Sequence, residues 1–130
     1  GKFEVLSSID DRVMLIKLIP GTAPDIIEYA MSQKYRAVVI EGFGAGGVPN
    51  DENNFLPAVE KALKAGIIVV CASQCMYDGV NLGEYPIGVL AARLGALSAG
   101  KMTVEAVCTK LMWALGNANT AEEAKALFLS

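Results

Sequence analysis

The stretch GIIVVCA, residues 66–72, decides the fold, because six consecutive apolar residues follow a glycine. Four of the six carry β-branched side chains, which favour a strand. A strand that is apolar on both faces is typical of a parallel sheet covered by helices on each side. Gly66 itself suits the C-terminal end of a preceding helix. We therefore expect residues 67–72 to form a central strand.

Strand-like and helix-like segments alternate on either side of this run. Short β-rich runs occupy residues 13–19 and 37–40, and a weaker strand candidate lies at 96–99. Helical periodicity occupies residues 26–31, 55–66, 87–94, 104–116 and 121–130. This alternation predicts a three-layer α/β/α domain with a parallel sheet of about four strands, in the style of flavodoxin-like folds.

Residues that start helices support this division. Thr22–Asp25 and Thr120–Glu123 have the pattern of a capping box, and Thr103 is a candidate N-cap. Residues 1–12 show no useful period, so we expect them to be the remnant of an interdomain linker and residues 13–130 to be the folded domain. The apolar stripe that includes Met112 and Trp113 is most simply packing surface.

Composition excludes several classes of function. The chain has 130 residues, 53% of them hydrophobic, and 11 basic against 14 acidic residues give a net charge of −3. Without a basic stretch we expect neither nucleic acid nor a membrane surface as partner. The longest apolar run is about a third of a membrane span. We expect a single soluble domain in the cytoplasm, since three cysteines form no ligand pattern and suit reduced thiols.

The sequence has no histidine, which rules out Ser-His, Cys-His and histidine-metal sites if the chain acts alone. Cys75 is therefore a poor candidate nucleophile. Glu41 and Glu84 form a conceivable carboxylate pair, although nothing in the sequence brings them together. We expect no catalytic residue, metal or cofactor in this chain.

Two long loops follow predicted strands, at residues 41–54 and 73–85. Ligands of open parallel sheets bind where strands pass into such loops. The first loop is rich in glycines, which either serve turn geometry or let backbone N–H groups approach an anion. It lacks the full dinucleotide and P-loop patterns. Polar residues of the second loop suit contacts to a small ligand but are also ordinary for a loop; they are Ser73, Gln74, Cys75, Tyr77 and Asp78.

Three segments taken together resemble the C-terminal domain of the L-asparaginase family, especially its cytoplasmic type I branch. They are AVVIEGFGAGGVPN (37–50), GIIVVCASQCMYDGVNLGEYPIG (66–88) and GKMTVEAVCTKLMWALG (100–116). The resemblance implies a two-domain enzyme that hydrolyses L-asparagine to L-aspartate and ammonia through an acyl-enzyme, without a cofactor. It implies that the nucleophilic threonines lie in an N-terminal domain, since the T-G-G-T and T-D motifs are absent here. It also implies packing against N-terminal domains within a homodimer or larger homo-oligomer.

Cytoplasmic members of the family can carry a second, allosteric asparagine site near the same two loops. The resemblance and the loop positions suggest a site for L-asparagine or L-aspartate made of Glu41, Gly44, Ala45, Gly46, Gly47, Ser73, Gln74, Cys75 and Tyr77. Some members have arginine at the position of Glu41 and asparagine at that of Gly47. Arginine would bind an α-carboxylate, whereas glutamate repels it and can pair with an α-amine.

Two expectations follow from the resemblance. The loops at 42–47 and 73–77 should lie side by side at the carboxyl edge of the sheet. An apolar face should be exposed where the N-terminal domain docks. Two other functions stay open, namely a component of a tRNA-dependent amidotransferase that releases ammonia from an amide donor, and a stand-alone domain that senses a small amino acid.

Overall fold

The computed structural model describes residues 8–19, 21–41, 55–72 and 92–130. Within these residues, four parallel strands form one sheet in the order β1-β2-β3-β4. The strands are β1 (Val13–Lys17), β2 (Ala37–Glu41), β3 (Ile68–Cys71) and β4 (Leu97–Ser98). The predicted α/β architecture with a four-stranded parallel sheet is confirmed.

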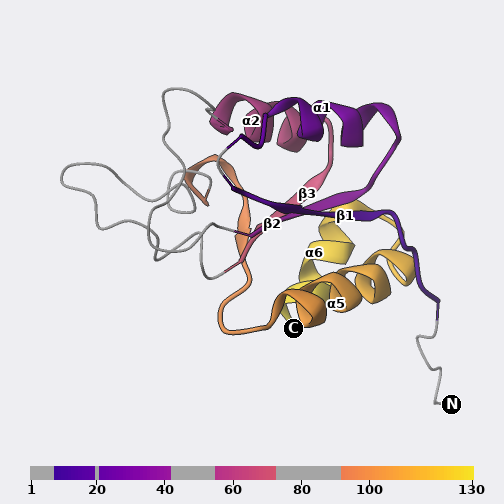
Figure 1. Ribbon diagram of the computed structural model, residues 1–130. Helices are drawn as coiled ribbons and strands as arrows, with labels where there is room; N and C mark the ends of the chain where they lie inside the picture. The colour runs from indigo at the N-terminus through magenta and orange to yellow at the C-terminus, as the bar shows by residue number, and fades with distance from the viewer. Residues whose placement is uncertain (1–7, 20, 42–54, 73–91) are drawn as a thin grey trace, which may run out of the picture.

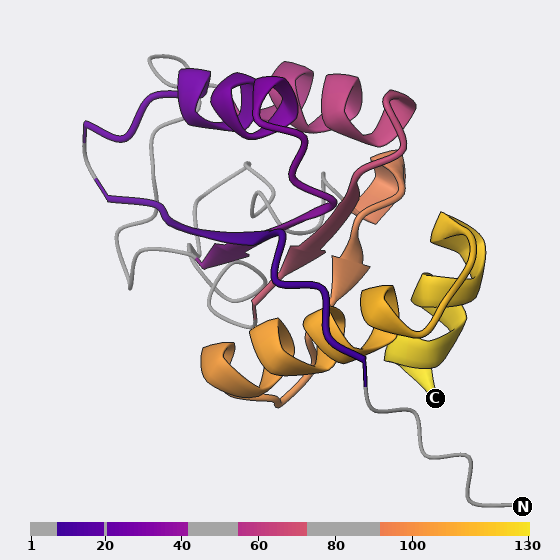
Figure 2. The same ribbon diagram turned by 90° about the vertical axis from the view of Figure 1, so that its right-hand side faces the viewer.

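Helices cover both faces of the sheet, as Figure 1 shows. One layer holds α1 (Asp25–Ser32) and α2 (Leu56–Lys64), and the other holds α5 (Val104–Gly116) and α6 (Ala121–Leu129). Figure 2, turned by 90°, shows the same three layers from the side. The strands follow one another across the sheet in chain order, and α1 and α2 cover the same face, as crossovers of one hand require. The chain reaches the other face after β4.

The alternation of side chains along the inner strands fills two separate cores. In β2, Val38 and Ile40 pack with α1 and α2, whereas Ala37 and Val39 pack with α5 and α6. In β3 all four side chains are buried. The prediction of a central strand within residues 67–72 is confirmed, with one residue fewer at each end. Helical structure at 92–94 belongs to the segment predicted as helix 87–94, whose other residues lie outside the described part of the chain.

The hydroxyls of two threonines cap helices as the sequence predicts. Thr103 Oγ1 accepts a hydrogen bond from the Ala106 N–H at 3.1 Å, and Thr120 Oγ1 accepts one from the Glu123 N–H at 3.1 Å. The capping box predicted at Thr22–Asp25 is wrong. Thr22 Oγ1 instead accepts from the Ile19 N–H and donates to the Lys17 carbonyl, so it stabilises the turn that leaves β1. Local side-chain bonds to a turn compete with capping, and here the turn prevails.

Both helices of the first layer end in a Schellman motif. After α2, Gly66 is left-handed at φ +91°, and the Ile67 N–H donates to the Ala62 carbonyl at 3.0 Å. After α1, the same position is held by Lys34 at φ +64°, and the Tyr35 N–H donates to the Ala30 carbonyl. Lys34 is the only described residue other than glycine with a positive φ. The end of α1 therefore carries a long cationic side chain where glycine is the conformationally favoured residue.

Residues 8–12 lie against α5. The Asn117 Nδ2 donates to the Ser8 carbonyl at 2.8 Å, and the Asp10 N–H donates to the Met112 carbonyl at 3.0 Å. A Cβ on Gly116 would stand 2.6 Å from the Ser8 oxygen, so glycine permits this close approach. Asp10 Oδ2 also lies 2.8 Å from Arg36 Nη1. This part of the segment is held by specific contacts, while the boundary between linker and domain at residue 12 stays a prediction.

The Asp10–Arg36 contact makes stability depend on pH. The hydrogen bond from Arg36 holds the pKa of Asp10 below its usual 3.8, against the opposing effect of burial. A lowered folded-state pKa contributes stability that is present above the unfolded value of 3.8 and is lost as the pH falls through the folded value.

Asp10→Asn should therefore lower the free energy of unfolding by about 1 kcal/mol near neutral pH, a modest amount because the pair is partly exposed. Urea unfolding above and well below pH 3.8 checks this. The gap in unfolding free energy between the unchanged protein and Asp10→Asn should narrow at the lower pH. Asp11→Asn, at the exposed neighbour, is the matched control. A gap that stays the same at both pH values would contradict the assignment.

Candidate functional site

A hollow of about 500 Å³ lies at the carboxyl edge of the sheet. It sits between the ends of β1 and β2 and the segment that leads into α5. Its lining consists of Leu15, Lys17, Glu41, Lys101, Met102, Thr103, Val104 and Glu105. At this edge the strands end and the chain passes into loops. Parallel sheets bind their ligands at this edge.

Glu41 is the acidic group on the strand side of the hollow. Only 13% of its side chain is exposed, and its Oε1 lies 3.6 Å from Lys17 Nζ. The two residues are direct partners in the β1–β2 register, so both side chains leave the ends of adjacent strands. Lys17 is 61% exposed, which makes the ion pair weak and the ammonium easily reoriented. Glu41 is thus the better positioned of the two charges.

The opposite wall is built by the start of α5. Thr103 turns the chain into the helix, and Glu105 lies in its first turn. Lys101 and Met102 precede the helix and complete the wall. The lining of the hollow therefore includes two acidic and two basic residues, together with the apolar residues Leu15, Met102 and Val104. Groups of both signs can hold the α-ammonium and the α-carboxylate of one amino acid.

Cys108 stands behind this wall on α5 and is half-buried. Burial raises the pKa of its thiol above 9.0, and the carboxylates of Glu105 and Glu41 raise it further. A thiol with a raised pKa is a poor nucleophile at neutral pH. Cys71 is buried within β3. Neither described cysteine is suited to covalent catalysis.

Of the predicted site residues, Glu41 alone lies in the described part of the chain, and it lines the hollow. The others lie outside it; they are Gly44, Ala45, Gly46, Gly47, Ser73, Gln74, Cys75 and Tyr77, together with Glu84 of the conceivable carboxylate pair. The chain enters both loops from adjacent strands, since the Ala72 N–H donates to the Ile40 carbonyl at 2.8 Å. That the loops themselves lie side by side stays a prediction.

The sequence reasoning missed four polar residues of the hollow, namely Lys17, Lys101, Thr103 and Glu105. Lys17 is the last residue of the first strand, which is a signal that the sequence contains. The other three precede or begin a helix, and only the packing of α5 across the sheet brings that helix to β1 and β2. Among the residues that the structure describes, no three potential metal ligands lie together, and no helix is long and apolar enough to cross a bilayer.

Comparisons with known proteins agree on one family. The model of the glutaminase/asparaginase C-terminal domain matches residues 12–128. The chain is 36% identical over 98% of its length to one of the subunits of the glutamyl-tRNA(Gln) amidotransferase of Pyrococcus abyssi, and it covers 28% of that protein. It is 39% identical over 88% of its length to an L-asparaginase of Thermococcus kodakarensis, of which it covers 34%.

Solved structures give the same result. The thermostable L-asparaginase from Thermococcus kodakarensis superposes with a TM-score of 0.72 at 37% identity, over 93% of this chain and 36% of that one. L-asparaginase I from Vibrio cholerae superposes with a TM-score of 0.75 at 31% identity, over 100% of this chain and 39% of that one. In these four matches the chain thus spans between 28% and 39% of the length of the other protein.

The proximity of Cys108 to the hollow is testable. Glu41→Gln should speed alkylation of the Cys108 thiol in mildly alkaline buffer, because removal of a nearby negative charge lowers the thiol pKa. The effect should be small, since burial is the largest cause of the raised pKa. Peptide mapping by mass spectrometry separates Cys108 from the other cysteines. Glu122→Gln, an exposed carboxylate on α6, is the control. Equal alkylation rates in both variants would count against the proximity of Cys108 to Glu41.

Proposed function

The chain belongs to the glutaminase/asparaginase C-terminal domain family, and on that premise we propose that it is the second domain of an L-asparaginase-type amidohydrolase. The reaction is the hydrolysis of L-asparagine to L-aspartate and ammonia. Because the chain covers only about a third of the asparaginases that it matches, the activity belongs to a longer polypeptide. In this proposal an N-terminal domain supplies the nucleophile, and the chain described above supplies part of a ligand site and of the subunit contacts.

The hollow at the carboxyl edge is the observation that carries this proposal. Its mixed charges suit a small zwitterion better than a simple anion or cation. The carboxylate of Glu41, which is largely buried, accepts a hydrogen bond from the α-ammonium of the ligand. Lys17 and Lys101 face it from β1 and from the start of α5, and either one pairs with the α-carboxylate.

The two loops complete the proposed ligand site. The loop after β2 contains Gly44, Ala45, Gly46 and Gly47, and the loop after β3 contains Ser73, Gln74, Cys75 and Tyr77. Since β2 and β3 are neighbours in the sheet, both loops start beside Glu41. We propose that residues of these loops contribute to binding of L-asparagine or L-aspartate, either as part of the substrate pocket or as a regulatory site.

Exposed apolar side chains suggest where the remaining protein docks. Leu15 and Ile19 are each 47% exposed, on or just after β1, and Ile9 precedes the same strand. Because β1 is an edge strand of the sheet, its outer side is open to a neighbouring domain. We propose that an N-terminal domain, from the same or a second copy, covers this side in a homo-oligomer. The free thiol of Cys108 fits a cytoplasmic enzyme.

A second candidate is the amidotransferase reaction. The similarity to a component of the glutamyl-tRNA(Gln) amidotransferase favours it, because it extends over nearly the whole chain. Both candidates release ammonia from an amide, and they differ in whether that ammonia is passed to a tRNA-bound acceptor. A third reading, a stand-alone amino-acid sensor, requires binding without hydrolysis in the intact protein.

The intact polypeptide should release ammonia from L-asparagine, whereas the purified chain of 130 residues should release none, because the proposed nucleophile lies outside it. A coupled ammonia assay measures both, with circular dichroism to show that the shorter chain is folded. Ammonia release by the folded short chain would refute the division of labour. Release from the intact protein that needs glutamyl-tRNA(Gln) would select the amidotransferase, and binding without release would select the sensor.

Binding at the carboxyl edge is tested separately. Glu41→Gln should weaken binding of L-asparagine to the intact protein by about tenfold, the effect of losing one charge-assisted hydrogen bond. Isothermal titration calorimetry measures it, with a catalytically inactive N-terminal domain to prevent turnover. Glu60→Gln, on the outer face of α2, removes the same charge far from the hollow and should have no effect. Unchanged affinity in Glu41→Gln would refute the role of Glu41.

A further inference from the structure

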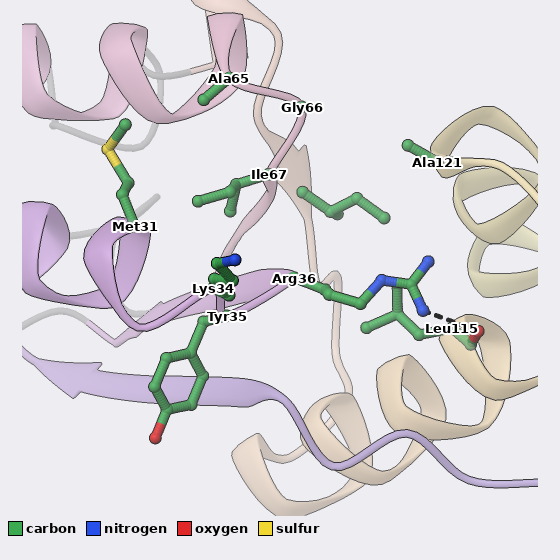
Figure 3. A pocket seen from close by; sticks show the side chains of 10 residues that line it. Met31, Lys34, Tyr35, Arg36, Ala65, Gly66, Ile67, Leu115 and Ala121 are labelled. Atoms are coloured by element: carbon green, nitrogen blue, oxygen red, sulfur yellow. Dashed lines mark hydrogen bonds between the residues drawn. The ribbon is translucent and has the colours of Figure 1, made fainter.

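A second pocket opens at the opposite, amino edge of the sheet, where β2 and β3 begin. It has a volume of about 350 Å³, within the range of small-molecule sites. Figure 3 shows that its walls come from both helical layers, with Met31 and Ala65 on one side and Leu115 and Ala121 on the other. The remaining lining residues are Lys34, Tyr35, Arg36, Gly66, Ile67 and Ile68. The proposed amidase function does not involve this edge.

The charged residues that line this pocket are both cations. Lys34 and Arg36 stand at the end of α1 and the start of β2, and no carboxylate is among the lining residues in the described part of the chain. Arg36 is held in place, because its Nη1 donates to Asp10 Oδ2 at 2.8 Å and to the Leu115 carbonyl at 3.3 Å. Figure 3 shows the guanidinium extended between Leu115 and Ala121. Asp10 neutralises part of the Arg36 charge from outside the pocket. The lining still has a net positive charge because it includes the ammonium of Lys34.

Lys34 holds its place at a conformational cost. It occupies the left-handed position that glycine holds after α2, and the hydrogen bonds of the two helix ends are the same. A glycine there would relieve the backbone and would leave no side chain. Lysine instead places an exposed ammonium beside a wall made of Met31, Ala65 and Ile67.

We propose that this pocket binds a small organic monoanion, a carboxylate attached to a compact apolar body. The carboxylate pairs with the ammonium of Lys34 and faces the guanidinium of Arg36. The apolar body covers the side chains of Met31, Ile67 and Leu115, which a hydrated inorganic anion would leave exposed. Small-molecule sites commonly combine such an apolar wall with a few polar groups that orient the ligand.

The test uses 4-methylpentanoate as probe and calorimetry on the intact protein. We expect saturable binding of the carboxylate, with no binding of the neutral analogue 4-methylpentan-1-ol and weaker binding of inorganic phosphate. Lys34→Gly should weaken binding of the carboxylate about tenfold, through loss of one charge-assisted contact. The same variant should raise the Tm by about 2 °C, since glycine relieves the left-handed backbone. A purely structural role for Lys34 would change the Tm and leave the affinity unaltered.

Two controls locate the site and separate it from the proposed amidase function. Lys64→Ala removes an exposed ammonium from α2 outside the pocket lining and should leave carboxylate binding unchanged. Glu41→Gln, at the opposite edge, should also leave it unchanged, while affecting L-asparagine. Absence of saturable carboxylate binding, equal affinity in Lys34→Gly, or equally tight binding of phosphate would each overturn the proposal, whatever the amidase assay shows.

Discussion

The burial of β2 and β3 on both faces is the constraint on which the rest of the structure depends. Val38 and Ile40 project into one core and Ala37 and Val39 into the other, so the sheet needs a helical layer on each side. Parallel pairing in turn requires crossover connections, and these place α1 and α2 together on one face. The layers therefore result from apolar side chains that point in alternate directions along two short strands.

Parallel strands also give the domain two different edges. At the carboxyl edge the chain passes into long loops, and the hollow there carries charges of both signs around Glu41. At the amino edge the Schellman turns of α1 and α2 lead directly into β2 and β3, and the pocket there is apolar with Lys34 and Arg36 as its charged residues. Because all the strands run in one direction, the two edges of the sheet differ. One small domain can therefore have two separate sites with different charges.

Much of the fold was predictable because its signals are local. The apolar run at 67–72 and the caps at Thr103 and Thr120 depend on neighbouring residues, and the structure contains all three. The capping box at Thr22 was wrong for a physical reason, since the same hydroxyl bonds the turn after β1. A threonine followed by an acidic residue fits both arrangements, and the chain path out of the strand decides between them.

The sequence by itself determined the order of strands and helices, the two-sided burial of the central strand and the resemblance to an asparaginase domain, because periodicity, capping residues and motifs act over short distances along the chain. Only the tertiary structure decided which distant groups meet. Glu41 and Glu105 share a hollow because α5 packs across the ends of β1 and β2. Arg36 joins Asp10 to the end of α5 because the amino ends of the strands lie beside it. Such contacts between distant residues depend on how the layers pack, and no local sequence pattern specifies that packing.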